Sequence, residues 1–335
     1  MIPLSSDTNP SSIDKNFPPY LELQQPEKRL INRRQIWAAN RFWMEIDSMK
    51  TRRYGTKSHH HWATLLFMMN AFKYFIKFAG LYKRGVRNAK NIQLLETPLS
   101  FIKLPKEFDG FTILLLSDLH LDSLEGLEHL ILNTLDNRVF DLCLFTGDYR
   151  TRLHGPNRNI ISKLKYLIEG INSREGFLGV LGNHDDCHMV NPLEKIGMHL
   201  LINESCLIQR GSSQIRIIGT DDVHYYYTDQ ALHALEHADN GFSVAMVHSP
   251  ELFDFASEMD VDLYLCGHTH AGQVCLPGGI PIIKHLNKGR RYYRGEWDYQ
   301  GMKGITSAGV GTSGIPVRFN TRGEILILKL LKKSL

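Results

Sequence analysis

Five short apolar stretches in the C-terminal two thirds of the chain each run directly into polar residues rich in Asp, Asn and His. Short, continuous apolar runs of this kind are typical of buried strands in a mostly parallel sheet. Because the carboxyl ends of parallel strands lie at one edge of a sheet, we expect the polar residues to converge on one crevice there. The stretches are residues 112–116, 142–145, 177–181, 244–247 and 263–266.

The polar residues that follow these strands supply oxygen and nitrogen ligands suited to a pair of divalent cations. Two ions roughly 3.5 to 4 Å apart need a carboxylate that touches both, with imidazoles or amides to complete each shell. No thiolate is needed in such a set, which favours Mn, Fe or Mg over a structural zinc ion. The runs are Asp118-Leu119-His120, Gly147-Asp148, Gly182-Asn183-His184-Asp185, His248 and Gly267-His268-Thr269-His270.

In their order and spacing these runs resemble the signature of the calcineurin-like metallophosphoesterase superfamily, D-x-H, G-D, G-N-H-D, H and G-H-x-H. A single dipeptide such as Gly147-Asp148 occurs by chance in many proteins, whereas five such runs in the family's order, each after an expected strand, are a specific signal for this family. The resemblance implies that Asp148 bridges the two ions. The other ligands then divide between the ions, with Asp118, His120 and His270 on one and Asn183, His248 and His268 on the other.

The same resemblance implies a reaction. A hydroxide activated by the two ions would attack a phosphate, and His184 would act as general acid, stabilising the developing charge and protonating the leaving oxygen. Asp185 would orient His184 or shape its loop. Arg150 follows Asp148 closely and is the candidate contact for a substrate phosphate.

Helical patterns at residues 124–138, 157–171 and 229–238 alternate with the strands, and a further strand is expected at residues 325–330. This alternation predicts an α/β fold. The family resemblance makes the expectation more definite: two packed mixed β-sheets flanked by helices, with the metals at the sheet edge. This catalytic domain is expected to occupy residues 101–335.

The N-terminal part of the chain has a different charge from the rest. Residues 1–100 carry 16 Lys and Arg against 7 Asp and Glu, a net charge of +9, whereas the remainder carries 23 against 28, a net charge of −5. Residues 1–29, rich in Ser, Pro and Asn, are expected to be disordered. Residues 30–100 are expected to form a basic, amphipathic helical region with helices over 30–53 and 62–84.

The second expected helix bears on membrane attachment. It would place Met68, Phe72, Phe75 and Ile76 on one face and lysines opposite. Lys73 and Lys77 would each cost roughly 2.5 to 3.5 kcal/mol at the centre of a spanning helix, so attachment in the plane of an anionic membrane surface is favoured. Packing of both helices on the catalytic domain is the alternative. Five cysteines, an odd number, and the lack of a signal-peptide pattern indicate a reducing, cytoplasmic location.

The glycine-rich tail from Gly304 to Phe319 and the run from Gly267 to Gln273 resemble a membrane-associated bacterial subgroup, the UDP-2,3-diacylglucosamine pyrophosphatases of the LpxG type. This resemblance implies hydrolysis of UDP-2,3-diacylglucosamine at the α-phosphate, giving UMP and 2,3-diacylglucosamine 1-phosphate (lipid X) in lipid A biosynthesis. It implies two divalent metal ions per chain, with Mn expected, and a peripheral position on the cytoplasmic face of the inner membrane.

Two other functions stay open at this point. One is a less selective metal-dependent phosphodiesterase or phosphatase acting on nucleotides or phospholipids. The other is a nuclease whose basic N-terminal part binds nucleic acid strands, although no nucleic acid partner is expected. The sequence leaves the oligomeric state and the acyl chain preference undetermined.

Overall fold

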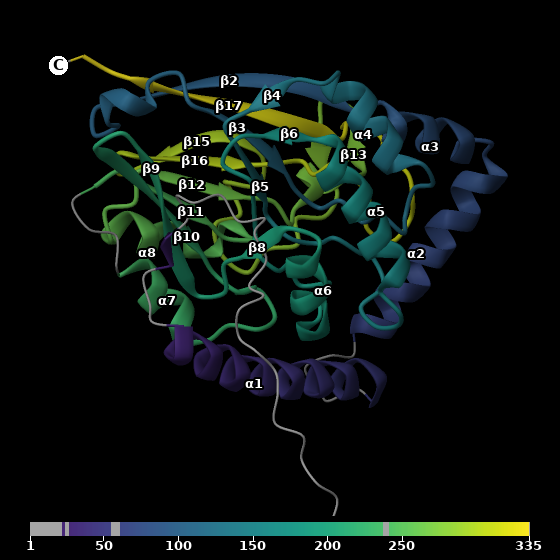
Figure 1. The fold of residues 1–335 in the computed structure, drawn as a ribbon. Helices are drawn as coiled ribbons and strands as arrows, with labels where there is room; N and C mark the ends of the chain where they lie inside the picture. Colours follow the sequence, from purple (N-terminus) through teal and green to yellow (C-terminus); the bar gives the residue numbers. More distant parts are fainter. Residues whose placement is uncertain (1–21, 24–26, 55–60, 237–240, 335) are drawn as a thin grey trace, which may run out of the picture.

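The computed structural model describes residues 22–23, 27–54, 61–236 and 241–334, and the side chains of residues 33–49, 67–236 and 241–334. Two β-sheets form the centre of the molecule and pack face to face (Figure 1). They share one buried apolar core, to which Ile113, Leu115 and Leu144 contribute from one sheet and Ile217, Val244 and Leu265 from the other. The predicted α/β fold with two packed mixed sheets flanked by helices is therefore confirmed.

The first sheet has the strand order β2-β17-β3-β5-β7-β8. Strand β17 runs antiparallel to β3 and parallel to β2, while β3, β5, β7 and β8 are parallel to one another. The strands are β2 (Gln93–Phe101), β3 (Thr112–Leu116), β5 (Leu142–Phe145), β7 (Phe177–Gly179), β8 (Met198–Leu200) and β17 (Glu324–Lys332).

The second sheet has the order β1-β9-β10-β11-β12-β16-β15. Its central strands β10, β11, β12 and β16 are parallel, and antiparallel β9 and β15 flank them. The strands are β1 (Glu22–Leu23), β9 (Glu204–Arg210), β10 (Ser213–Gly219), β11 (Ser243–Met246), β12 (Leu263–Cys266), β15 (Gly295–Tyr299) and β16 (Met302–Thr306). Two short pairs lie apart from both sheets: β4 (Val139–Phe140) with β6 (Asn172–Ser173), and β13 (Cys275–Leu276) with β14 (Ile280–Pro281).

Helices cover the outer face of each sheet (Figure 1). Helices α4 (Leu127–Leu135), α5 (Arg158–Gly170) and α6 (Val190–Lys195) pack on the first sheet, and α7 (Asp229–Leu235) and α8 (Phe253–Glu258) pack on the second. Single 3₁₀ turns span Lys106–Phe108, Cys187–Met189, Pro250–Leu252 and His270–Gly272. The predicted strands and helices of the catalytic domain are thus found, with ends that differ from the prediction by up to a few residues.

Helix α1 (Glu27–Tyr54) lies along the lower edge of the body in Figure 1 and contacts it through polar side chains. Arg34 donates to the backbone oxygen of Leu200 at 2.6 Å and pairs with Glu204 at 2.7 Å. The indole of Trp37 donates to Asp221 at 2.7 Å. Basic and aromatic residues that the sequence suggested for a membrane surface therefore hold α1 against the catalytic domain.

Helices α2 (His61–Phe78) and α3 (Tyr82–Lys90) replace the single helix expected over 62–84. The break falls at Gly80, which has a φ of +71°. There the amide of Leu81 donates to the Ile76 oxygen at 2.8 Å and that of Gly80 to the Lys77 oxygen at 3.1 Å, as in a glycine C-terminal cap. One face of α2 packs on the domain, because Ile76 is buried in a small cluster with Ile315 and Val317.

The predicted disorder of residues 1–29 falls largely outside the described residues. Within that range, Glu22 and Leu23 pair with β9, and α1 begins at Glu27. In the described part of the chain, no helix combines the length and the apolarity that crossing a membrane requires. All five cysteines are buried free thiols.

Candidate metal centre

The predicted ligand runs meet at one edge of the two sheets. Strands β3, β5 and β7 of the first sheet and β11 and β12 of the second each end shortly before one run, at Leu116, Phe145, Gly179, Met246 and Cys266. Hydrogen bonds tie the runs together: the amide of His120 donates to the backbone oxygen of Asp148 at 3.0 Å, and the amide of His268 donates to the Asp118 carboxylate at 3.0 Å. The convergence expected from strand polarity is therefore what the structure has.

The first group of converging ligand atoms belongs to Asp118, His120, Asp148 and His270, which offer atoms that all lie within 4.8 Å of one another. Nε2 of His120 is 3.1 Å from Nε2 of His270, and the two rings stack with centroids 5.0 Å apart. Nε2 of His120 lies 3.5 Å from the Asp148 carboxylate, and Nε2 of His270 lies 3.4 Å from that of Asp118.

The second group contains Asp148, His248 and His268, again with atoms within 4.8 Å of one another. Oδ1 of Asn183 lies 3.0 Å from Nε2 of His248 and 2.8 Å from Nδ1 of His268, so Asn183 belongs to this group as well. The Asp148 carboxylate is 3.4 Å from Nε2 of His248. Asp148 is the one member that both groups share, which is the position predicted for the bridging ligand.

Backbone carbonyls fix which nitrogen of each histidine faces the centre. Nδ1–H of His120 donates to the Arg150 oxygen at 2.9 Å, and Nδ1–H of His248 donates to the Thr146 oxygen at 2.7 Å. Nε2–H of His268 donates to the His285 oxygen at 2.9 Å. The opposite nitrogen of each ring is left facing Asp148 or Asn183, which is how metal-binding imidazoles are held in proteins.

The protonation states suit cations. Burial lowers the pKa of His120 to about 4 and holds the pKa of His268 and His270 well below the ordinary value, so these rings are neutral and present lone pairs. Burial also lowers the pKa of His248, but the Asp148 carboxylate outweighs it and raises this pKa well above the usual range. A divalent ion bound there would displace the His248 proton.

Two neutral imidazoles that face each other at 3.1 Å, with carboxylates beside them, form a donor set that matches a buried cation. The seven side chains fit the two divalent ions that the sequence predicts, and they do so without a thiolate.

The backbone bends sharply at the ligands. Asp118, His120, Asp148, His268 and His270 all have φ between 40° and 71°, a left-handed conformation that costs of order 1–3 kcal/mol at each non-glycine residue. Such strain persists where the surrounding structure imposes it and is typical of functional sites.

The glycine-rich tail supplies part of that support. The amides of Val310 and Gly311 donate to the backbone oxygens of Ser117 and Asp118, both at 2.9 Å. A Cβ on Gly311 would lie 2.1 Å from the Leu119 oxygen, so only glycine allows this approach. The tail therefore holds the first ligand loop in place.

Asp185 joins the loop that carries Asn183 and His184 to the loop that carries Asp148. Its carboxylate accepts hydrogen bonds from the amides of Gly182 and Asp148 at 2.8 Å and of Tyr149 at 3.0 Å. Burial, with the nearby Asp148 carboxylate, raises the pKa of Asp185 to about 7. Of the two roles predicted for Asp185, the contacts favour shaping the loop.

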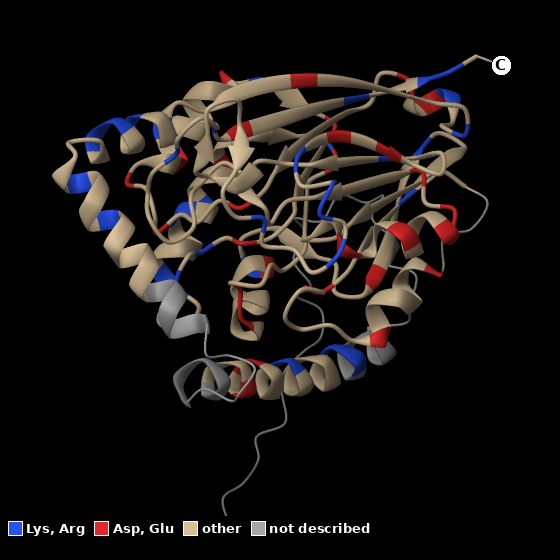
Figure 2. Ribbon diagram, turned by 180° about the vertical axis from the view of Figure 1, so that it is seen from behind, with Lys and Arg blue, Asp and Glu red and all other residues tan. Residues whose placement is uncertain are grey.

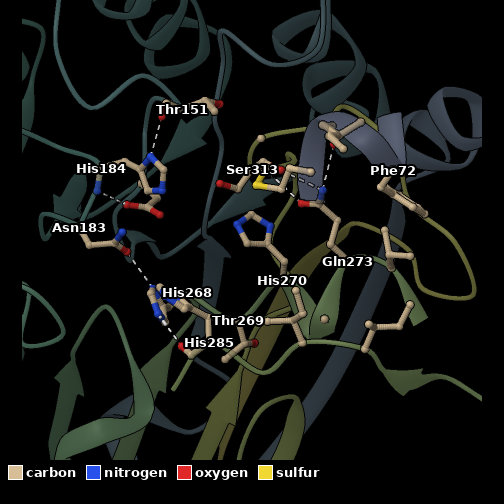
Figure 3. Close-up of a pocket in the computed structure, with 18 of the residues that line it drawn as sticks. Phe72, Thr151, Asn183, His184, His268, Thr269, His270, Gln273, His285 and Ser313 are labelled. Carbon is tan, nitrogen blue, oxygen red and sulfur yellow. Dashed lines mark hydrogen bonds between the residues drawn. The ribbon is translucent and has the colours of Figure 1, made fainter. Parts of the chain in front are cut away.

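His184 stands beside the ligand groups without joining either. Its Nδ1–H donates to the backbone oxygen of Thr151 at 2.6 Å (Figure 3), so Nε2 is the nitrogen that can face a substrate. Its ring centroid is 5.0 Å from that of His120. His184 also lines the cavity that opens over the centre. This is where a proton donor to a departing oxygen would have to stand.

Arg150 does not occupy the place predicted for it. The side chain is only 2% exposed, and its guanidinium donates to the backbone oxygens of His184, Leu153 and Gly155 and pairs with Asp186 at 2.7 Å. All three guanidinium nitrogens donate to groups of this loop. Arg150 therefore holds the His184 loop in place and is not available to bind a substrate phosphate. Position in the sequence placed it near the site but could not show where its side chain points.

Two buried arginines that support the centre were missed. Arg318, fully buried, donates to the backbone oxygens of His270, Ala308 and Gly311 and so joins a ligand loop to the glycine-rich tail. Arg41 of α1 pairs with Asp221 at 2.6 Å and donates to the backbone oxygen of Asp185 at 2.9 Å. Their partners in the ligand loops, His270 and Asp185, lie far away in the sequence, so no local sequence pattern predicts that these two arginines support the metal centre.

Replacing Arg41 with methionine is expected to lower the free energy of unfolding by about 3–5 kcal/mol, because Asp221 and Glu45 would remain buried without their cation. Urea denaturation followed by circular dichroism measures the change. Arg33→Met, on the exposed side of the same helix, is the control and should change stability by no more than about 0.5 kcal/mol. Equal losses in both variants would contradict the assigned role of Arg41.

Comparison with known proteins gives one family. The family model for calcineurin-like phosphoesterases matches residues 111–272, a segment that contains all seven predicted ligands. An uncharacterized metallophosphoesterase of Bacillus subtilis, YkuE, is 30% identical over 251 residues, 71% of this chain and 86% of the relative. One from Helicobacter pylori is 29% identical over 305 residues, 87% of this chain and 75% of the relative.

A third relative is a phosphodiesterase of Escherichia coli, YaeI, which is 28% identical over 250 residues, 71% of this chain and 88% of the relative. The family-model match contains all five ligand runs, including the shared Asp148 of the centre. The chain belongs to the calcineurin-like metallophosphoesterase family and is a metal-dependent phosphoesterase.

Proposed function

We propose that this phosphoesterase hydrolyses the pyrophosphate bond of a lipid-linked nucleotide, with UDP-2,3-diacylglucosamine as the substrate and UMP and 2,3-diacylglucosamine 1-phosphate as the products. The proposal includes Mn as the metal and a peripheral position on the cytoplasmic face of the inner membrane. It combines the metal centre with the shape and chemistry of the cavity beside it.

The cavity is the observation that carries this proposal. It has a volume of about 580 Å³, within the usual range for small-molecule sites, and Asp148, Asn183 and His184 lie at one end. The rest of its wall is mainly apolar and comes from α2, from Leu153, from the chain around β13 and β14 and from the glycine-rich tail at Ile315 (Figure 3). The apolar lining consists of Met68, Met69, Phe72, Leu153, Val274, Ile282, Ile283 and Ile315.

A substrate with a phosphate and a hydrocarbon part would satisfy both ends. Each methylene of an acyl chain that leaves water for such a wall contributes about 0.8 kcal/mol. Methionine and phenylalanine adapt to the irregular surface of a flexible chain. A water-soluble nucleotide alone would leave the apolar wall in contact with water, and so the cavity favours a lipid-linked substrate over a free nucleotide.

The mechanism assigns separate tasks to the chain's own residues. Two divalent ions, when bound by the seven ligands, would neutralise the phosphate and lower the pKa of a water molecule that attacks it. His184, held by Thr151, is placed to give a proton to the oxygen that departs. The carbonyl contacts of His120, His248 and His268 keep the ligands aligned, and the apolar wall excludes water from the reacting end.

Incubation of the purified protein with Mn²⁺ and UDP-2,3-diacylglucosamine is expected to yield UMP, measured by mass spectrometry. The same sugar nucleotide without acyl chains should be turned over with a kcat/KM at least about a hundred-fold lower, because it cannot use the apolar wall. A chelator is the control and should stop both reactions. Equal turnover of the acylated and acyl-free substrates would instead establish the less selective phosphodiesterase.

A further inference from the structure

The outward face of α2 is strongly apolar. While Met69, Phe72 and Ile76 face the domain, Phe75 is 62% exposed and Phe78 is 95% exposed. Phe67, Met68 and Tyr74 are exposed as well. A single exposed aromatic residue is ordinary, but several on one helix mark an interaction site. The inner face already packs on the domain, so this second apolar face requires a different partner.

A second exposed apolar segment lies in the chain around β13 and β14. Leu276, Ile280, Ile282 and Ile283 are each more than half exposed. Gly278 and Gly279, with φ of +83° and +76°, form the turn between the two strands. Four large exposed aliphatic side chains within residues 276–283 are an unusual surface for a soluble protein.

The two segments frame the mouth of the same cavity. Met68 from α2 and Ile282 and Ile283 from the β14 segment are both exposed and part of its lining. The segments are about two hundred residues apart in the sequence, yet they meet at the opening that leads to the metal centre. The apolar surface outside is therefore continuous with the apolar wall inside. We call these two segments, residues 67–81 and 276–283, the apolar rim.

Charge around the apolar rim is of one sign. Residues 61–90 contain six Lys and Arg and no Asp or Glu, and residues 273–294 contain five and none. In Figure 2 the visible length of α2 carries blue segments and no red ones. Both stretches thus combine exposed apolar side chains with cations alone, and an anionic lipid surface is complementary to both features.

We propose that the apolar rim inserts into the surface of an anionic bilayer and places the mouth of the cavity against it. Phe75, Phe78 and the isoleucines of the β14 segment enter the acyl boundary, while Lys77 and Lys284 meet the head groups. A lipid-linked substrate then passes from the bilayer into the cavity without crossing water. This last step rests on the substrate of the proposed function, whereas insertion of the rim rests on the exposed side chains and the charge of the two segments and would supply the peripheral position that the proposed function includes.

The test is co-sedimentation of the full chain with vesicles of phosphatidylcholine and phosphatidylglycerol. The wild type is expected to bind, and Ile282→Asp/Ile283→Asp and Phe75→Asp/Phe78→Asp should each lower the partition coefficient at least about ten-fold. Raising the salt concentration or omitting phosphatidylglycerol should weaken binding of the wild type. Thermal unfolding checks that each variant is folded.

The control is Ile102→Asp/Val139→Asp. These residues are 51% and 52% exposed, close to the 58% and 54% of Ile282 and Ile283. Ile102 lies beside Lys332, near the end of β17 that is remote from α2 (Figure 1). The control variant should bind vesicles like the wild type. Full binding by both rim variants, or an equal loss in the control, would overturn the proposal.

Nucleic acid is the other anionic partner, and the same variants separate it from a bilayer. Binding to single-stranded DNA without binding to anionic vesicles would overturn the proposal. The outcome also distinguishes the rim from the proposed substrate. Vesicle binding through the rim without release of UMP would reject the proposed substrate and support the membrane contact of the rim. Release of UMP from detergent-dispersed substrate without vesicle binding would reject the membrane contact and support the substrate.

Discussion

Replacement of Asp148 with asparagine is expected to lower kcat/KM for any phosphodiester substrate at least about a thousand-fold. Asp148 is the one carboxylate that belongs to both ligand groups, and it lies 3.5 Å from Nε2 of His120 and 3.4 Å from Nε2 of His248. Asparagine keeps the shape but removes the charge that both ions would share. Kinetics with a chromogenic phosphodiester measure the loss of kcat/KM. Metal analysis of the purified variant should also show less bound metal than in the wild type.

The matched control for this variant is Asp141→Asn. Asp141 is 3% exposed, against 2% for Asp148, and its carboxylate accepts from the amide of Thr112 and pairs with Arg174 and Arg210. Losing that charge should lower the free energy of unfolding by about 1–3 kcal/mol while the metal content stays that of the wild type. If Asp148→Asn kept both its metals and its activity, Asp148 would not be the bridge.

The strands and the ligands were predictable because both depend on local pattern. A buried strand is a short apolar run, and the residue after it is placed by strand direction alone. Residues 112–116, 142–145 and 263–266 are the strands β3, β5 and β12 as predicted. The ligand runs then had to meet at one edge, and they do.

Side-chain direction and long-range partners were not predictable in this way. Arg150 was assigned to the substrate because it follows Asp148 by two residues, but its guanidinium turns into the loop and binds Asp186. Arg41 looked like a surface cation of a basic helix, yet it lies buried against Asp221, 180 residues away. Whether a cation faces water or a buried carboxylate depends on the packed fold and not on its neighbours in sequence.

For the N-terminal helices, too, the sequence pattern could not predict which apolar side chains pack on the domain. A helical wheel assigns one apolar face, and the sequence placed Phe72, Phe75 and Ile76 together on it. In the structure Ile76 packs on the domain while Phe75 points away from it. Domain packing and the proposed membrane contact are therefore not alternatives for α2, because its apolar residues divide between two faces.

His184→Ala is expected to lower kcat by about a hundred-fold to ten-thousand-fold for a phosphodiester with an alkyl leaving group, the usual contribution of a general acid. The reason is its position: the ring stands beside His120, lines the cavity and is held by the Thr151 oxygen. An alkoxide is a poor leaving group, so its departure depends strongly on protonation of the leaving oxygen. For p-nitrophenolate, which leaves as an anion at neutral pH, the loss should be no more than about ten-fold.

The ratio of the two losses separates proton donation from a structural role. A variant that merely disturbed the site would lose activity equally with both leaving groups and would also lose metal. His184 belongs to neither ligand group, so His184→Ala should keep the metal content of the wild type. His188→Ala is the matched control, since His188 is exposed and contacts Phe42 of α1. An equal loss of kcat for alkyl and p-nitrophenyl substrates in His184→Ala would remove His184 from the role of general acid.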